Sequence, residues 1–309
     1  MTRSGSPSDP ETCLLFGEVL FDHFPDGRQT LGGAPFNVAW HLEALGARPV
    51  LLSRIGNDRE GDRVLRAMED WGLSTAGIQR DPENPTGRVR VALDGDDPTF
   101  HIEPEQAWDF VDPYQAARVA DSSGAELVYH GTLATRLPTS SRALDRTLEA
   151  VPEAAVFVDL NLRPPWWDRD GLLERLRDAD VCKLNAEELR RIQETDGEEE
   201  LSRQTAQFRG EHDLERVWLT RGDQGALTVG EEGRVMSSSA PRVEEMEDSV
   251  GAGDAFAAVT LLGILQGWEP ERTLGRAVSF AAELCRHRGA TPESPDLYRE
   301  ILDRWETEG

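Results

Sequence analysis

Short apolar runs alternate along the chain with longer stretches of helical periodicity. Residues 13–20 (CLLFGEVL) and 49–55 (PVLLSRI) have the apolar character of buried strands. Residues 35–45 and 58–71 have helical spacing, and each stretch is followed directly by a glycine. Further strands of the same type are expected at 126–130, 155–160, 181–184 and 216–220. This alternation predicts an α/β fold with βαβ units on a doubly wound, mainly parallel sheet, flanked by helices on both faces.

One region has a different strand pattern. Residues 88–93 (RVRVAL) and 99–103 (TFHIE) alternate polar and apolar positions, which is typical of an antiparallel hairpin with one solvated face. We therefore expect a small antiparallel flap that can exclude water from a neighbouring cleft. Polar clusters at 159–163, 185–188 and 220–225 each follow a predicted strand, and ligands bind at the carboxyl ends of strands in open α/β sheets.

Composition narrows the class of protein. The 309 residues include 58 acidic and 33 basic side chains, and the net charge of −25 makes nucleic acid and anionic membranes poor partners. The polar N-terminus lacks the pattern of a signal peptide, and the longest apolar run, 255–265, is too short to span a bilayer. We therefore expect a soluble, cytoplasmic protein. Lys183 is the only lysine and lies in no Walker A loop, which excludes a P-loop NTPase.

A glycine-rich turn precedes the most apolar predicted helix. In EDSVGAGDAF, the residues GAG are expected to form the entry turn of a helix that begins at Asp254 and ends at Gly267. Small residues let a ligand approach the backbone closely, and the N-terminal amides of a helix favour an anion. From these residues alone, Asp254 is either a helix cap or a functional carboxylate. A dinucleotide-binding fingerprint is disfavoured, because no apolar strand precedes the turn and Phe256 breaks the glycine spacing.

A second glycine-containing stretch lies far upstream. In GGAPFNVA, Gly32 and Gly33 precede a helix whose first turn carries Asn37. The simplest interpretation is a turn followed by a helix start. The functional interpretation is a backbone surface that meets a polyol, with Asn37 hydrogen-bonded to its hydroxyl groups.

Together, GGAPFNVAWHLEALG and DSVGAGDAF resemble the two signatures of the PfkB, or ribokinase-like, family of carbohydrate kinases. With the polar clusters between them, the resemblance covers residues 14–291. It implies a ribokinase-like α/β domain with a small β lid, and transfer of the γ-phosphate of ATP, with Mg²⁺, to a sugar hydroxyl. We accordingly expect a disordered tail at 1–12 and a kinase domain at 13–305, with a lid from segments 20–31 and 87–105.

The resemblance also implies roles for individual residues. Asp254 matches the family's catalytic base, and we expect the helix dipole to keep it ionised near neutral pH. The positions that match the anion hole are Gly251, Ala252, Gly253 and the amide of Asp254. The positions that match the sugar-binding set are Asp22, Gly32, Gly33 and Asn37. Arg163 follows a predicted strand and is either a group that binds phosphate or substrate, or a surface arginine.

A nucleotide and metal site is implied in the same way. The matching positions are Asn185 and Glu188 of an NxxE motif, and Thr220, Gly222 and Gly225 of a nucleotide-phosphate loop. Glu188 is expected to reach Mg²⁺ through water, because this ion keeps much of its hydration. Asp248 matches a monovalent-cation site, which implies a role for K⁺.

The segments GEVLFDHFP, GGAPFN and DLNLRPPWW are most similar to the fructokinase-like branch, which implies fructose or a similar ketose as the substrate. Kinases for 2-keto-3-deoxygluconate share much of this pattern, but Glu103 on the predicted lid would repel a substrate carboxylate. A nucleoside kinase of the same fold and a non-catalytic sugar- or nucleotide-binding homologue are the remaining alternatives. Because an amphipathic flap can pair with its twin, we expect a homodimer through the lid.

Overall fold

One large sheet forms the centre of the molecule. Among the residues that the computed structural model describes, 12–94, 97–194 and 200–307, nine strands form this sheet in the order β13-β12-β11-β10-β9-β8-β1-β4-β5. The strands from β11 to β5 are parallel, and β12 and β13 extend one edge in antiparallel pairing. Their bounds are β1 Thr12–Phe16, β4 Arg48–Gly56, β5 Ile78–Asp81, β8 Leu127–Gly131, β9 Ala155–Asp159, β10 Val181–Asn185, β11 Arg216–Thr220, β12 Ala226–Val229 and β13 Val235–Ser238.

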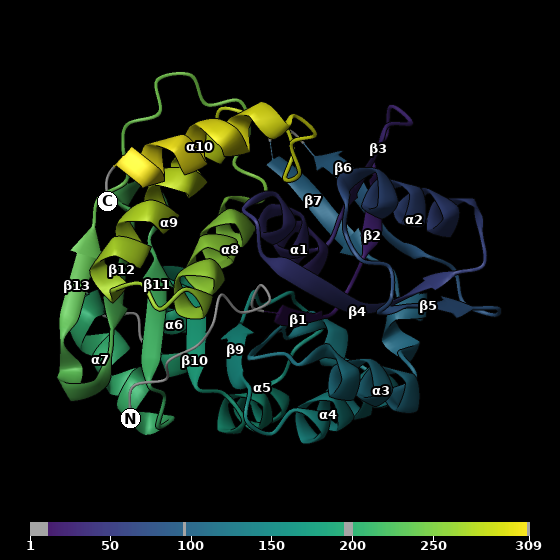
Figure 1. The fold of residues 1–309 in the computed structure, drawn as a ribbon, viewed down its shortest axis with the longest axis horizontal. Helices are drawn as coiled ribbons and strands as arrows, with labels where there is room; N and C mark the ends of the chain where they lie inside the picture. The colour runs from purple at the N-terminus through teal and green to yellow at the C-terminus, as the bar shows by residue number, and fades with distance from the viewer. Residues whose placement is uncertain (1–11, 95–96, 195–199, 308–309) are drawn as a thin grey trace.

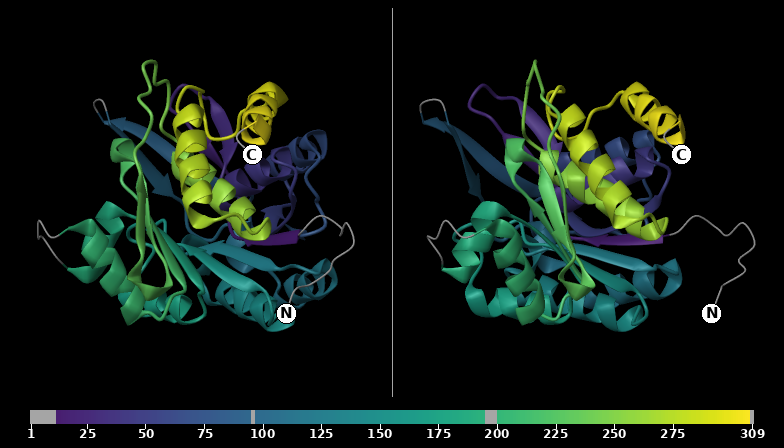
Figure 2. Two further views of the ribbon diagram at one scale, coloured as in Figure 1. Left: turned by 60° about the vertical axis from the view of Figure 1, so that its left-hand side comes forward. Right: turned by 90° about the vertical axis from the view of Figure 1, so that its left-hand side faces the viewer.

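Helices cover both faces of this sheet, as Figure 1 and Figure 2 show. One layer contains α1 Ala34–Ala44, α2 Arg59–Trp71, α8 Ala252–Leu265, α9 Pro270–Leu284 and α10 Pro295–Thr307. The other contains α3 Pro113–Ser123, α4 Pro138–Ala150, α5 Arg169–Arg177, α6 Ala186–Gln193 and α7 Leu201–Glu211. Short 3₁₀ turns are η1 Ala107–Phe110, η2 Leu133–Thr135, η3 Gly222–Gln224 and η4 Glu231–Gly233. Across the described ranges, none of these helices combines the length and the apolar character that a bilayer crossing requires.

Successive residues of the central strands are buried on opposite faces of the sheet. Leu14 and Phe16 of β1 belong to the core that is shared with α3 and α4. Cys13 and Leu15 belong to the core that is shared with α1, α8 and α9. Strands that are buried on both faces have continuous apolar sequences, which explains the unbroken runs in this chain. The predicted doubly wound, mainly parallel fold is therefore confirmed.

The single strand predicted at 13–20 is wrong in its extent. β1 ends at Phe16, and a separate strand, β2 Leu20–His23, belongs to another sheet. The break lies at Gly17, where a Cβ atom would be 2.4 Å from Cγ of Pro35 at the start of α1. The close approach of α1 therefore admits only glycine at the point where the chain leaves the main sheet.

A small four-stranded sheet follows from this departure. It contains β3 Gln29–Gly32, β2, β6 Gly87–Asp94 and β7 Asp97–Ile102, in that order. The pairs β2–β3 and β6–β7 are antiparallel hairpins, and β2 and β6 pair in parallel between them. The hairpin predicted from alternation is confirmed, and β2 and β3 extend it on one side.

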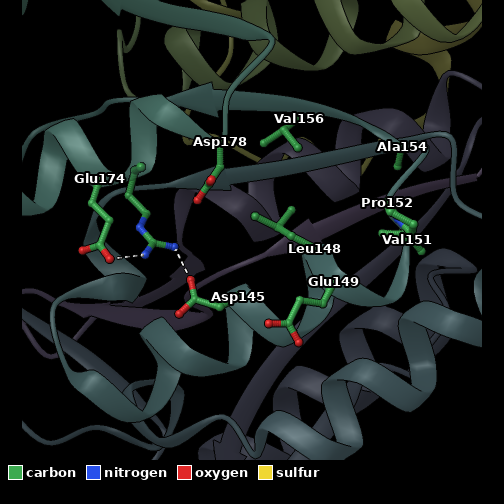
Figure 3. Close-up of a pocket in the computed structure, with 10 residues that line it drawn as sticks. Asp145, Leu148, Glu149, Val151, Pro152, Ala154, Val156, Glu174 and Asp178 are labelled. Atoms are coloured by element: carbon green, nitrogen blue, oxygen red, sulfur yellow. Dashed lines mark hydrogen bonds and ion pairs between the residues drawn. The ribbon is translucent and has the colours of Figure 1, made fainter.

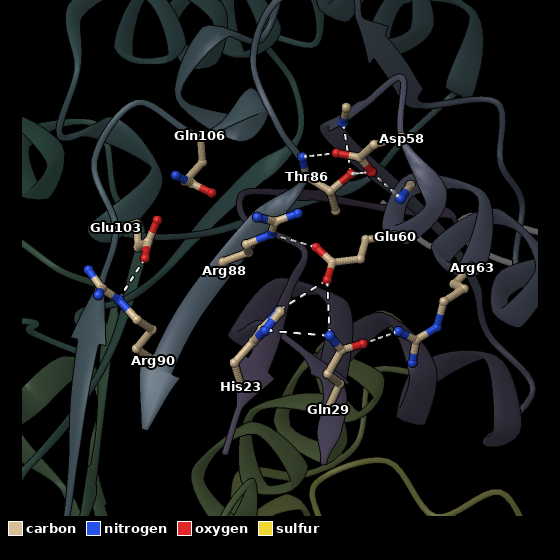
Figure 4. A network of polar contacts seen from close by, with 12 residues as sticks. His23, Gln29, Asp58, Glu60, Arg63, Thr86, Arg88, Arg90, Glu103 and Gln106 are labelled. Atoms are coloured by element: carbon tan, nitrogen blue, oxygen red, sulfur yellow. Dashed lines mark hydrogen bonds and ion pairs between the residues drawn. The ribbon is translucent and has the colours of Figure 1, made fainter. Parts of the chain in front are cut away.

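Glu60 of α2 connects the small sheet to the main domain (Figure 4). Its Oε2 lies 2.7 Å from Nε of Arg88 on β6, and its Oε1 lies 3.1 Å from Nε2 of His23 on β2. Asp58, the N-cap of α2, accepts a hydrogen bond of 2.9 Å from the backbone N–H of Thr86, directly before β6. The start of α2 therefore holds both hairpins of the small sheet.

Candidate active site

The candidate site lies at the carboxyl ends of the parallel strands. A separate hollow lies at the opposite edge of the sheet and is not part of this site. That other hollow, of about 520 Å³, lies at the amino end of β9 between α4 and α5 (Figure 3). In it, the buried guanidinium of Arg175 contacts Asp145 at 2.7 Å and Glu174 at 3.6 Å. Arg175 thus joins α5 to α4, and none of the predicted site residues is among the residues that line this hollow.

Two side chains from distant parts of the chain meet near the beginnings of α1 and α8. Nδ2 of Asn37 donates a hydrogen bond to Oδ2 of Asp254 at 2.7 Å. A Cβ atom at Gly32 would lie 3.6 Å from Oδ1 of Asn37 and 3.9 Å from Oδ2 of Asp22. The structure thus places Asn37 against Asp254, and Gly32 next to both Asn37 and Asp22, so a side chain at position 32 would contact Asn37 and Asp22.

The helix α8 begins two residues earlier than predicted, at Ala252, and Gly251 is its N-cap. Within the described chain, no side chain caps this N-terminus, and Asp254 is bonded to Asn37 instead. The interpretation of Asp254 as a helix cap is therefore wrong, although its carboxylate lies in the first turn. Gly251 has a left-handed φ of +82°, and a Cβ there would be 2.4 Å from Cβ of Ala290. Only glycine fits this cap position.

Burial controls the charge of Asp254. Desolvation raises the pKa of this carboxyl group to about 6, and the hydrogen bond from Asn37 and the charge of Lys183 act in the opposite direction. The expectation that Asp254 is ionised near neutral pH is compatible with this value, although burial rather than a neighbouring charge has the largest effect on the pKa. Above pH 6 the group is mainly ionised and, with a pKa close to neutrality, is suited to accept a proton as a general base.

Arg163, in the loop after β9, lies near three carboxyl groups. Its positive charge lowers the pKa values of Glu18, Asp22 and Asp254, although burial leaves all three above their usual range. The side chain is exposed, and no ion pair within 4 Å involves it among the described residues. Arg163 is thus a surface arginine that faces the candidate site.

Glu18, which lies between β1 and β2, was not among the residues expected at the site. Its side chain is buried, its Oε2 has no hydrogen-bond partner among the described residues, and burial raises its pKa to about 7. The backbone of Ala34, the first residue of α1, acts in the opposite direction and lowers this pKa. The backbone of Glu18 also lies close to Gly33, where a Cβ atom would be 2.6 Å from the Glu18 carbonyl oxygen. An acidic residue between two apolar strand segments was the available signal.

A buried ion pair under α8 was also missed. Nζ of Lys183, on β10, lies 2.9 Å and 2.7 Å from the two carboxylate oxygens of Asp159 at the end of β9. The hydroxyl of Tyr129 donates to the same carboxylate at 3.3 Å. The signal in the sequence was that Lys183 is the only lysine.

The NxxE residues form a capping box at the start of α6. Oδ1 of Asn185 accepts a hydrogen bond of 2.9 Å from the backbone N–H of Glu188, and Oε2 of Glu188 accepts one of 2.8 Å from the N–H of Asn185. Oε1 of Glu188 accepts a third, of 2.7 Å, from the N–H of Leu162. Both carboxylate oxygens therefore join the loop after β9 to the end of β10, which places Asn185 and Glu188 at the carboxyl edge of the sheet.

A large hollow of about 620 Å³ lies beside the first turn of α8. Its lining residues include Thr220, Gly222, Gly225, Ala252 and Gly253. The remainder of the lining is mainly apolar and comes from residues 240–246 and from α9. A smaller hollow beside it is lined by Asn185, Thr220 and Gly222. Apolar walls beside a helix N-terminus suit a ligand with a flat aromatic part and an anionic part, such as a nucleotide.

Asp248 fastens the turn before α8 to the segment that follows α9. Its Oδ1 accepts a hydrogen bond of 3.0 Å from the N–H of Val250, and its Oδ2 accepts one of 3.1 Å from the N–H of Gly289. In the described part of the chain, no three His, Cys, Asp or Glu side chains are grouped to hold a metal ion. A metal in this site would therefore depend on ligand oxygens, backbone carbonyls or water.

Comparison with known proteins agrees with this arrangement. The model of the pfkB family of carbohydrate kinases matches residues 12–297. A protein from Pyrococcus horikoshii that is named as a sugar kinase is 28% identical, over 92% of this chain and 89% of its own length. Fructokinase of Escherichia coli is 27% identical, over 81% of this chain and 83% of its own length. The structure of a Xylella fastidiosa fructokinase with bound ATP aligns with a TM-score of 0.82 at 24% identity, over 96% and 99% of the two chains, and shows the same fold.

Proposed function

The chain belongs to the pfkB family of carbohydrate kinases, phosphotransferases that act on a sugar hydroxyl, and we propose that its acceptor is fructose or a similar ketose. The observation that carries the proposal is the contact between Asn37 and Asp254 beside Gly32 and Asp22. It puts a proton acceptor next to a set of groups suited to bind hydroxyls. ATP is the proposed phosphoryl donor, because the neighbouring hollow combines a mainly apolar lining with the first turn of α8, which suits a nucleotide.

In the proposed reaction, Asp254 acts as the general base. Its Oδ2 is occupied by Asn37, so its Oδ1 receives the proton of the sugar hydroxyl. The hydroxyl oxygen then bonds to the γ-phosphorus as the bond between this phosphorus and the bridging oxygen breaks, and ADP leaves. The amides from Gly251 to Asp254 hold the charge of the transferring group, because they point out of the N-terminus of α8.

The proposed nucleotide site also accounts for the metal. Thr220, Gly222 and Gly225 hold the phosphates of ATP, together with Asn185. Mg²⁺ fits a site in which the phosphates supply most of the ligands, and Glu188 reaches it through water, because both of its oxygens already accept backbone N–H groups. When bound, the ion neutralises phosphate charge.

A monovalent cation, K⁺, is proposed at the turn that Asp248 holds. The supporting observation is that this carboxylate draws together the turn before α8 and the segment around Gly289, where backbone carbonyls are close enough in sequence to supply further ligands. A cation there would stabilise the anion turn without contacting the substrate.

Charge pairing on the small sheet favours a neutral sugar over a sugar acid. Arg90 of β6 pairs with Glu103 at 2.7 Å, and Arg88 pairs with Glu60 at 2.7 Å. Both arginines of this strand are thus neutralised by acids of the protein itself, which leaves them poor partners for a substrate carboxylate. Arg163 favours the alternative substrate, 2-keto-3-deoxygluconate, because its positive charge makes no ion pair among the described residues.

We also propose that the small sheet is the lid of a single domain and that two copies of the chain pair through it.

A substrate panel tests the proposal. Fructose, tagatose, ribose, 2-keto-3-deoxygluconate and adenosine are each supplied with ATP and Mg²⁺, and ADP release is measured. We expect the highest kcat/KM with a ketose. A higher value with 2-keto-3-deoxygluconate would replace the ketose by a sugar acid. Sugar binding without ADP release for any acceptor would favour the non-catalytic homologue instead.

A further inference from the structure

A buried lysine lies directly under the first turn of α8 and has no part in the function proposed above. The side chain of Lys183 is 8% exposed, and the Asp159 carboxylate that holds it is 1% exposed. The lysine is therefore fixed in place rather than mobile at the surface, and it is the chain's single lysine among 33 basic residues.

The ammonium group of Lys183 faces Gly253 with nothing between them. A Cβ atom at Gly253 would lie 3.5 Å from Nζ, which is an ordinary van der Waals contact. Of the three N–H groups of Lys183, Asp159 accepts two, and the third has no hydrogen-bond partner among the described residues. A positive charge thus lies behind the same turn whose amides form the anion hole.

We propose that Lys183, oriented by Asp159, is a positioning residue for phosphoryl transfer: its ammonium group adds positive potential at the Gly253 turn and keeps the Asp254 carboxylate ionised. The inference rests on the proposed function, because the anion at this turn is the transferring phosphoryl group. The charge of Lys183 acts strongly here, since this lysine and its Asp159 partner are buried.

Several groups from different elements determine the charge state of Asp254. They are Lys183 of β10, Asp159 and Tyr129 of β9 and β8, Asn37 of α1, Glu18 between β1 and β2, and Arg163 after β9. Lys183 lowers the pKa of Asp254, and its effect exceeds the opposing effect of Asp159. The two halves of the ion pair therefore act on the base in opposite directions. Glu188 and Asp254 also keep the lysine protonated, together with Asp159.

A purely structural ion pair would behave differently. Buried pairs are weak evidence for stability, and removal of either partner leaves an unpaired buried charge. On that hypothesis, Lys183→Met and Asp159→Asn would both damage the fold and lower activity together. On that hypothesis, the two substitutions would not shift the pH dependence of kcat/KM in opposite directions.

The test measures the acidic limb of kcat/KM against pH. Lys183→Met should move this limb upward by about half a pH unit or more, because the carboxylate loses the positive charge that lowers its pKa most. Asp159→Asn should move it downward, because the ammonium group then acts without its opposing charge. Lys183→Arg should keep the wild-type limb. Shifts in the same direction, or no shift in either variant, would overturn the inference.

Two further measurements keep the result clear. Affinities for AMP-PNP with Mg²⁺ and for adenosine are measured without sugar, and Lys183→Met should weaken AMP-PNP about tenfold while adenosine is unchanged. An unchanged AMP-PNP affinity would overturn the role of Lys183 even in an enzyme that phosphorylates fructose. Because this binding is measured without sugar, it tests the role of Lys183 even if the enzyme phosphorylates no sugar and the proposed function is wrong. Thermal unfolding shows whether each variant is folded. If Lys183→Met does not fold, the shift of the acidic limb in Asp159→Asn tests the inference instead.

Discussion

Asn37 and Asp254 share a hydrogen bond of 2.7 Å across 217 positions of sequence. The bond joins α1, whose first turn is part of the GGAPFN stretch, to α8, whose first turn is part of the GAGD stretch. It also distinguishes the two oxygens of Asp254, because Oδ2 accepts this bond and Oδ1 is the oxygen that we propose as the proton acceptor.

Asp254→Asn should abolish most of the phosphoryl transfer. The amide keeps the shape of the side chain but cannot accept the hydroxyl proton, and we expect kcat to fall by about 10²–10⁴-fold. Binding of MgATP, measured by calorimetry, should be unchanged, because Asp254 does not line the hollow that we propose for the nucleotide. Asp303→Asn, on the exposed face of α10, is the matched control. Wild-type turnover in Asp254→Asn would remove this residue as the base.

Asn37→Ala should move the acidic limb of the pH profile upward. Wild-type kcat/KM should fall as the pH drops through about 6, because protonated Asp254 cannot accept a proton. The Asn37 hydrogen bond stabilises the ionised form, so its loss raises the pKa of Asp254 further. Rates over pH 5–8 check this. A limb at the same pH in both proteins would show that the bond does not control the base.

Asp254→Asn should also stabilise the fold, but only at higher pH. The pKa of Asp254 rises on folding from 3.8 to about 6, so the folded state binds this proton more tightly than the unfolded state. Stability from this group is complete below pH 3.8 and is lost as the pH rises through 6. The variant should therefore exceed the wild type by at most about 3 kcal/mol at pH 8. Urea unfolding at pH 8 and pH 4 compares them, and lower stability of the variant at pH 8 would contradict the linkage.

Two alanine substitutions separate the shape of the turn from its charge. Gly251→Ala should destabilise the fold by roughly 2 kcal/mol or more, because its φ is left-handed and its Cβ would overlap Ala290. Gly253→Ala should fold normally, since its Cβ makes only an ordinary contact with Lys183. The methyl group would nevertheless cover the ammonium group, so we expect kcat to fall without a loss in Tm. Full activity in Gly253→Ala would argue against an approach of phosphate to this residue.

Exchange of K⁺ for Na⁺ should lower the activity of the wild type. In Asp248→Ala, the activity should be low and no longer depend on which cation is present, because the carboxylate that bridges Val250 and Gly289 is lost. Initial rates in the two chloride salts at equal ionic strength measure this. An equal response of both proteins would remove the cation site while leaving the kinase itself in place.

Local sequence patterns determined the architecture. Mainly apolar runs such as 13–20 and 155–160 predicted strands that are buried on both faces, because such burial favours apolar side chains at successive positions. Period-two alternation predicted the hairpin of β6 and β7, and the glycines and proline at 32–35 predicted the start of α1. Each of these features depends on neighbours within a few positions. The motifs at 32–37 and 251–254 also contain Asn37 and Asp254, which the structure brings into contact.

The chemistry of the site depended on the tertiary structure. Whether Asp254 caps its helix or bonds Asn37 depends on a partner that is far away in the sequence. Its pKa depends on desolvation by the packed helices and on the charge of Lys183, and neither can be calculated from the local sequence. Glu18 and the pair of Lys183 with Asp159 were missed for the same reason. A charged residue in an apolar segment acquires a role only when packing determines which group faces it and how much water remains.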